Sequence, residues 1–102
     1  MLKLRKVTGH LQAPNAYRVV LTLADGADLE VGSIGHQTGN HMRQYWYWGL
    51  DTVLPSQAFP TRGEAIDRDE AMVAFKAMWE MFTADSDRLA VFLADKLRRS
   101  RA

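Results

Sequence analysis

The sequence predicts an α+β fold, with an antiparallel sheet in the first half of the chain and helices in the second half. Between residues 17 and 54, apolar and polar residues alternate with a period of two, which is typical of strands that bury one face. The pair Asp25-Gly26 separates two of these runs and is typical of a tight hairpin turn. After residue 67, apolar residues recur every three or four positions, as on the buried side of a helix.

Length and composition are those of one globular domain, over residues 1–102. The chain has 102 residues, of which 47% are hydrophobic and 25% are charged. It has no cysteine, which excludes disulfide scaffolds, thiol catalysis and cysteine-based zinc sites. No secretory signal is apparent, and every apolar run is far shorter than the ~20 residues that span a bilayer. We therefore expect a cytoplasmic protein that has no membrane partner.

The sheet, over residues 17–54, is predicted as a three-stranded antiparallel meander. Residues 1–15 form either an N-terminal arm or a fourth strand at its edge. The first central strand runs from Tyr17 to Leu23 and the second from Asp28 to Ile34. In the second strand, alternation places Leu29 and Val31 in the core and Ile34 on the opposite face. Residues 35–41 are polar and contain glycine, so we expect a loop there.

Aromatic residues dominate the third predicted strand, from Gln44 to Leu54. Alternation places Trp46 and Trp48 on one face, where we expect the first helix to cover them. Tyr45 and Tyr47 then lie on the other face of the sheet. Residues 55–63 contain two prolines and are expected to form a second loop.

Two helices are predicted, over residues 67–82 and 86–99. Asp67 is a good N-cap, and Glu70 three residues later completes a pair like a capping box. The second helix is amphipathic, with an apolar stripe at Leu89, Phe92, Leu93 and Leu97. After the first helix has packed on one face, a single small sheet leaves little apolar area to bury this stripe. The second helix therefore either covers the second sheet face or makes a dimer contact.

Three segments together resemble a family of short bacterial proteins that has no assigned activity. They are LEVGSIG at residues 29–35, WYWGLDTVLP at residues 46–55, and DEAM at residues 69–72 followed by Phe75 and Trp79. The family shares a core of the form EVGSI, WxWGIDTVLP and EEAMxxFxxxW. The resemblance covers residues 17–82 and implies a small α+β fold without implying any chemistry.

Charge is distributed unevenly along the chain. Residues 1–6 carry three basic side chains and residues 96–102 carry four, whereas residues 7–95 carry six basic and twelve acidic ones. Basic residues at the end of the last helix suit the negative end of its dipole. Basic termini are alternatively suited to holding phosphates of a nucleic acid.

The face that carries Tyr45 and Tyr47 is the strongest functional candidate, because tyrosine is enriched at interfaces. We expect a non-catalytic module that binds a protein partner or forms a homodimer, through this face or through the last helix. The alternative is a nucleic-acid-binding accessory protein, in which the tyrosines stack on bases. The candidate interaction surface comprises Arg18, Arg43, Tyr45, Tyr47, Phe92, Arg98 and Arg99.

Catalytic patterns are weak in this sequence. A third hypothesis is a small enzyme in which His36, His41 and Asp51 hold a metal ion or supply a base. The spacing of the histidines matches no helix or finger pattern. The glycines of residues 32–39 lack the Lys-Ser/Thr pair of a phosphate-binding loop. We therefore expect no enzymatic activity and no bound cofactor.

Overall fold

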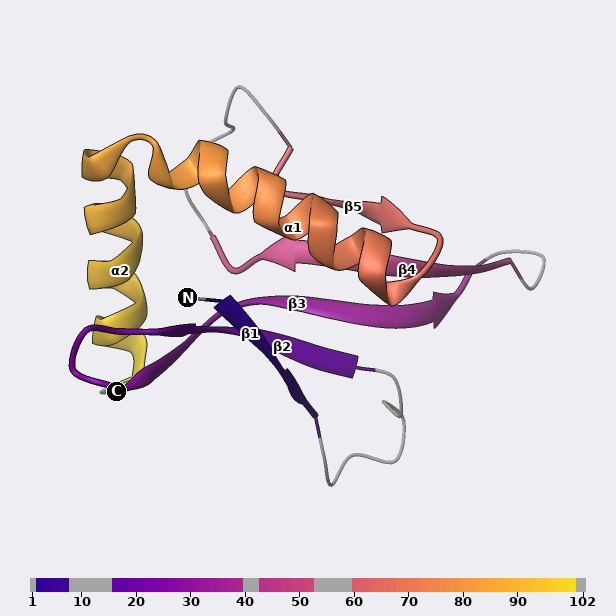
Figure 1. The fold of residues 1–102 in the computed structure, drawn as a ribbon, viewed down its shortest axis with the longest axis horizontal. Coiled ribbons are helices and arrows are strands. Elements are labelled where there is room, and N and C mark those ends of the chain that lie inside the picture. The colour runs from indigo at the N-terminus through magenta and orange to yellow at the C-terminus, as the bar shows by residue number, and fades with distance from the viewer. Residues whose placement is uncertain (1, 8–15, 40–42, 53–59, 101–102) are drawn as a thin grey trace.

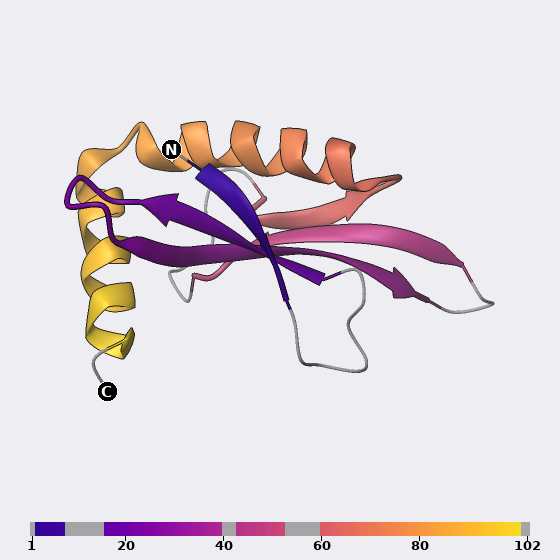
Figure 2. The same cartoon turned by 60° about the horizontal axis from the view of Figure 1, so that its bottom comes forward.

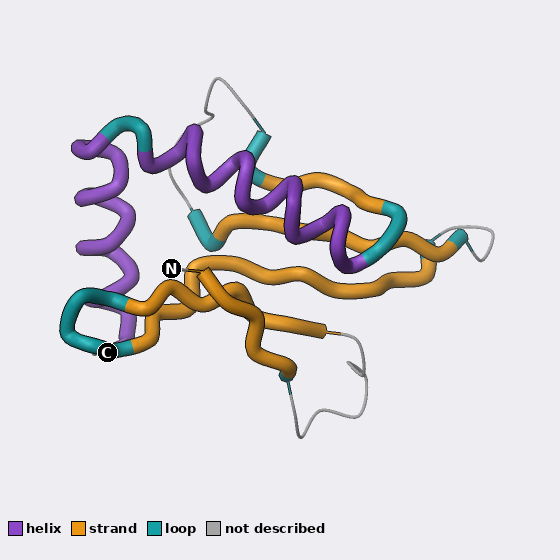
Figure 3. The backbone as a smooth tube through the Cα atoms, viewed as in Figure 1, coloured by secondary structure: helices purple, strands orange, loops and turns teal. Residues whose placement is uncertain are grey.

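The computed structural model describes residues 2–7, 16–39, 43–52 and 60–100, which form a five-stranded sheet and two helices (Figures 1 and 3). The strands are β1 (Leu2–Lys6), β2 (Ala16–Thr22), β3 (Asp28–Thr38), β4 (Gln44–Leu50) and β5 (Arg62–Ala65). The helices α1 (Arg68–Thr83) and α2 (Ser86–Ser100) follow. Neighbouring strands pair antiparallel in the order β1-β2-β3-β4-β5. The α+β class is confirmed, and the meander has five strands where three or four were predicted.

The two edge strands account for this difference. β1 pairs with β2, with Leu4 opposite Val19. Of the two alternatives for the N-terminal segment, an arm or an edge strand, residues 2–6 therefore form the edge strand. β5 pairs with β4 and includes two residues of the predicted second loop. None of its four residues is β-branched or aromatic, which is why the sequence pattern did not indicate a strand. Residues 8–15 and 53–59, the latter including the predicted end of the third strand at Leu54, lie outside the described residues.

The β2–β3 hairpin has the predicted tight turn, with Gly26 at a positive φ of 86°. A β-bulge further along corrects the predicted orientation of Ile34. Val19 pairs with Gly32 and Val20 with Glu30, so Val31 is an extra residue in β3. The bulge reverses the alternation, and Ile34 lies fully buried in the core instead of on the opposite face.

β3 is also longer than predicted, because residues 35–38 continue the strand instead of forming a loop. Two glycines in it let aromatic rings approach the backbone. A Cβ at Gly32 would lie against the Phe75 ring and 2.5 Å from the Gly49 carbonyl oxygen. A Cβ at Gly35 would lie 2.5 Å from the Tyr47 hydroxyl. Phe75 and Tyr47 thus press on β3 from opposite sides of the sheet.

The core lies between one face of the sheet and α1, which Figure 2 shows above the strands. Asp67 is the N-cap of α1, as predicted, and its Oδ1 accepts the Glu70 N–H at 2.7 Å. Phe75, Met78 and Phe82 of α1 are at most 1% exposed. Burial of such side chains contributes about 1.5–3 kcal/mol each to stability.

The corner between α1 and α2 is fixed by two polar side chains. Asp85 Oδ1 accepts the backbone N–H of Asp87 and of Arg88, at 3.0 and 3.1 Å, at the start of α2. The Arg88 guanidinium donates to the carbonyl oxygens of Phe82 and Met81, at 2.9 and 2.6 Å, at the end of α1. The two helices are therefore separate, although neither glycine nor proline stands between them.

α2 crosses the end of the sheet steeply to α1 (Figure 1). Phe92 is 2% exposed, and its ring centroid lies 5.4 Å from that of Phe82 and 6.1 Å from that of Trp79. This side chain completes the core at the end of the sheet that α2 crosses. α2 does not lie over the two tyrosines of β4. Within the described part of the chain, neither helix is long and apolar enough to cross a membrane.

Candidate interaction surface

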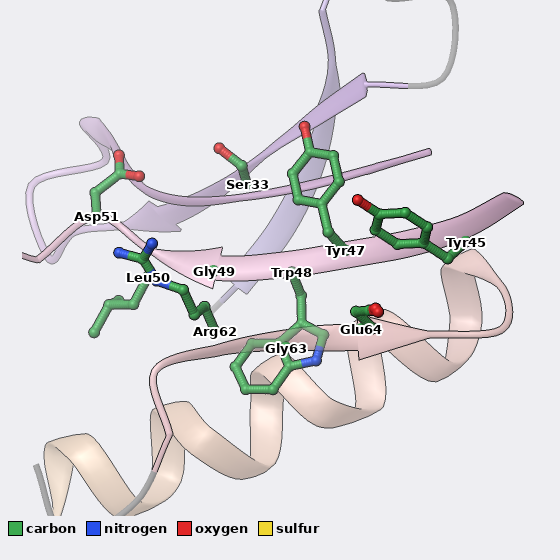
Figure 4. Close-up of a pocket in the computed structure, with 10 residues that line it drawn as sticks. All are labelled: Ser33, Tyr45, Tyr47, Trp48, Gly49, Leu50, Asp51, Arg62, Gly63 and Glu64. Carbon is green, nitrogen blue, oxygen red and sulfur yellow. The ribbon is translucent and has the colours of Figure 1, made fainter. Parts of the chain in front are cut away.

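The sheet face that points away from α1, called the open face below, carries the predicted tyrosines. Trp46 and Trp48 lie on the α1 side, and Tyr45 and Tyr47 on the opposite side, as predicted. Figure 4 shows Tyr45, Tyr47, Ser33 and Asp51 on the open side and Trp48 pointing toward α1. No described helix covers β4 on this side (Figure 2).

A shallow groove of about 400 Å³ runs along β4 and β5 on the open face (Figure 4). Tyr45 and Tyr47 bound it toward one end and Asp51 toward the other. Gly49 lies between them, and a Cβ at this position would meet only the Cβ of Arg62, at 3.4 Å. The groove therefore exists because glycine follows the two large aromatic residues on this face.

Arg43 and Tyr45 form a polar cluster at one end of the groove. The Arg43 guanidinium lies 4.8 Å from the centre of the Tyr45 ring and donates to both Glu64 carboxylate oxygens, at 2.8 and 2.9 Å. The Tyr45 hydroxyl donates to Gln37 Oε1 at 2.8 Å. These contacts hold the Tyr45 ring in place, whereas the Tyr47 hydroxyl has no hydrogen-bond partner within the described ranges.

Arg18 lies on the same face, toward the other end of the groove, in an ionic network. Its guanidinium pairs with Asp51 and donates to the Ser33 hydroxyl, and its Nε lies 3.6 Å from Glu30. Lys96 of α2 donates to the same Asp51 carboxylate at 3.1 Å. The network thus connects β2, β3, α2 and the residue that follows β4.

The environment of Asp51 favours its charged form. Partial burial raises the pKa of Asp51, but the hydrogen bonds from Arg18 and Lys96 outweigh that effect and lower the pKa below its usual 3.8. Both cations also act through their charge. Asp51 is therefore an ionised anchor at neutral pH.

The structure separates α2 residues of the predicted surface from the tyrosines. Phe92 is in the core, so it is not a surface residue. Arg98 and Arg99 lie on the last turn of α2, where both pair with Asp95, at 2.7 and 3.1 Å. α2 stands at the end of the sheet where β4 finishes, away from the Tyr45 end (Figure 1). Of the predicted set, Arg18, Arg43, Tyr45 and Tyr47 share the open face.

Of the residues in the enzyme hypothesis, His36 and Asp51 are described by the structure, and the two lie on opposite faces of the sheet. His36 faces the α1 side of the sheet, opposite Trp46 in the β3–β4 ladder, with the two rings 5.6 Å apart. Asp51 lies at the other end of β4 on the open face, and His41 is outside the described residues. Among the described residues, no group of three or more His, Asp or Glu side chains is placed to hold a metal ion.

Sequence reasoning missed Arg62 and Glu64, because it placed the start of β5 in a loop. Arg62 extends from β5 toward the Asp51 end of the groove (Figure 4). It makes no ion pair with any described residue. The spacing of charged residues around Gly63 was the available signal, since alternation sends Arg62 and Glu64 to the same face.

Comparison of the chain with protein-family models, with curated proteins and with solved structures found no significant match. The family resemblance at residues 17–82 therefore stays a prediction.

Proposed function

We propose that this protein is a non-catalytic interaction module in the cytoplasm, and that it forms a homodimer through the open face. The observation that supports the proposal best is the pair Tyr45 and Tyr47 beside a groove on the part of the open face, along β4, that no described helix covers. Tyrosine buries a large area at a low entropic cost and retains a hydroxyl for hydrogen bonding, which suits it to interfaces.

The charges on the open face support a second copy as the partner. Arg62 extends into the groove without an ion-pair partner among the described residues. Glu64 and Asp51, which also pair with Arg43 and with Arg18 and Lys96 respectively, contribute carboxylate oxygens to the same groove. A two-fold interface brings each patch against the same patch of the partner. A face that carries both signs of charge can therefore complement itself when one copy is turned around.

The alternative, nucleic-acid binding, has less support, because five of the six described basic side chains near the ends of the chain are already paired. Lys3 lies 3.1 Å from Asp28, and Arg5 pairs with Glu30. Lys96 is held by Asp51, while Arg98 and Arg99 share Asp95. A phosphate backbone would have to compete with these internal carboxylates. In addition, these cations do not converge on Tyr45 and Tyr47.

A dilution series followed by ¹H–¹⁵N NMR tests which surface takes part. We expect the backbone resonances of Tyr45, Tyr47 and Gly49 to shift as the protein is diluted. Val73 and Met81, which are 68% and 46% exposed on α1, are the matched controls and should not shift. Shifts confined to α1 would contradict the proposal, as would resonances that do not depend on concentration.

A further inference from the structure

A second aromatic surface lies on the opposite side of the sheet, at the N-terminal end of α1. Tyr17 of β2, His36 of β3 and Trp46 of β4 are half-buried there. The Tyr17 and Trp46 ring centres are 6.4 Å apart with 26° between the ring planes. His36 meets Trp46 edge-on, at 5.6 Å and 68°. Three neighbouring strands thus present one aromatic floor.

Carboxylates stand at the rim of this floor. A hollow of about 370 Å³ is lined by Tyr17 and Trp46 and by Asp67, Arg68 and Asp69. The Asp69 side chain is 91% exposed. Asp67, the N-cap of α1, and Asp69 line the hollow, and Glu70 follows in the first turn, so three carboxylates stand near one guanidinium. This negative charge exceeds the roughly half positive charge of the helix N-terminus.

The guanidinium of Arg68 already lies over the Tyr17 ring of this aromatic surface, but its contacts there are long. Its guanidinium carbon lies 5.5 Å from the centre of the Tyr17 ring, and an N–H donates to the Tyr17 hydroxyl at 3.4 Å. Its Nε is 3.8 Å from the Asp69 carboxylate, and the side chain is 49% exposed. These distances lie at the weak end of each kind of interaction. An incoming cation can displace Arg68 into solvent at little cost.

We propose that this hollow is a binding site for an organic cation, the side chain of an arginine or lysine in a basic partner segment. Aromatic faces attract cations, and the carboxylates at the rim supply the complementary charge. Arg68 is the internal occupant that the ligand replaces. The site is independent of the proposed homodimer, because it lies on the other face of the sheet.

The probe is N-acetyl-arginine methylamide, titrated at constant ionic strength and followed by the indole N–H resonance of Trp46. The matched control ligand is the uncharged citrulline analogue, which has the same shape. We expect a saturable shift at Trp46 with the arginine compound, a much smaller shift with the citrulline compound, and little change at Trp48 and Trp79. Trp46→Phe assigns the resonance.

Three variants separate the proposed site from general charge attraction. Asp69→Asn should weaken binding about 2–5-fold, and Arg68→Ala should strengthen it by a similar factor, since each exposed cation contact contributes about 0.5–1 kcal/mol. Glu80→Gln removes an exposed carboxylate farther along α1 and should leave the affinity unchanged. Equal shifts with both ligands, no saturation, or an unchanged affinity in either Asp69→Asn or Arg68→Ala would overturn the proposal.

Discussion

At the residue scale, Asp51 connects parts of the chain that are far apart in sequence. Its carboxylate holds Arg18 of β2 and Lys96 of α2, and its backbone N–H donates to the Val31 carbonyl at 2.8 Å. Only 27% of its side chain is exposed. Removal of its charge takes a shared carboxylate away from two partly buried cations.

Asp51→Asn should lower the free energy of unfolding at pH 7 by about 1–2 kcal/mol, between the values for exposed and buried pairs. Because the pKa of Asp51 is lowered in the folded state, the stabilisation is present in full above the unfolded value of 3.8. It is lost as the pH falls through the folded-state pKa. Urea unfolding of both proteins from neutral to acidic pH measures the difference.

The control for this substitution is Glu80→Gln, which removes an exposed carboxylate that has no partner among the described residues. Its stability should follow that of the wild-type protein at every pH. A wild-type advantage over Asp51→Asn that grows below pH 3.8 would contradict the assigned direction of the pKa shift.

Gly32 tests the close approach of α1 to the sheet. Gly32→Ala should lower stability by about 1–3 kcal/mol, because the new methyl group meets both the Phe75 ring and the Gly49 carbonyl oxygen. Gly49→Ala on the neighbouring strand is the matched control, since its Cβ has an ordinary 3.4 Å contact with Arg62. Thermal melts of the two variants measure the difference, and equal melting temperatures would argue against this packing.

At the element scale, the α1–α2 corner depends on Arg88. This side chain donates to two carbonyl oxygens at the end of α1, and its guanidinium carbon lies 5.1 Å from the centre of the Phe82 ring. Arg88→Ala should therefore cost about 1–2 kcal/mol of unfolding free energy. Arg98→Ala removes an exposed arginine whose ion-pair partner among the described residues is Asp95 of the same helix, and it should cost at most about 0.5 kcal/mol. Chemical denaturation compares them, and similar losses would refute the role of Arg88 in the corner.

Strong local patterns predicted most of the elements, and tertiary pairing determined the rest. The Asp25-Gly26 turn, the Asp67 cap and the alternation around Trp46 each carry a local signal, and the structure has all three. β5 carries none, because its residues become a strand only by pairing with β4. The bulge at Val31 could have been found, since the odd spacing from Val31 to Ile34 breaks a period of two.

At the scale of the whole molecule, basic residues near both ends of the chain form ion pairs with acidic residues of its middle part. The basic N-terminal strand pairs through Lys3 and Arg5 with Asp28 and Glu30 of β3. Lys96 near the other end pairs with Asp51. The sequence showed the charge blocks but not which of them meet, because that depends on the order of strands in the sheet.

Because these cations are paired, we expect no change in tryptophan or tyrosine fluorescence on addition of mixed-sequence oligonucleotides at low or moderate salt. Quenching by single-stranded or double-stranded oligonucleotides that weakens as salt is added would instead favour the nucleic-acid alternative.

The candidate surface was predictable to the extent that it depends on strand alternation. Tyr45 and Tyr47 lie on the expected face because alternation within β4 is regular. Phe92, Arg98 and Arg99 were grouped with them, but the position of α2 at the end of the sheet depends on packing against Phe82. An apolar stripe indicates that one side of a helix is buried, but it does not indicate which element the helix packs against.

The central claim, self-association through the open face, is tested most directly by the solution mass from sedimentation equilibrium. The wild-type protein should approach twice the monomer mass of 11.6 kDa as its concentration rises. Tyr45→Thr combined with Tyr47→Thr keeps residues that favour strands and should remain monomeric. Val73→Ala combined with Met81→Ala on the outer face of α1 should associate like the wild type. A monomeric wild-type protein at every concentration, or a tyrosine variant that dimerises equally well, would contradict the account.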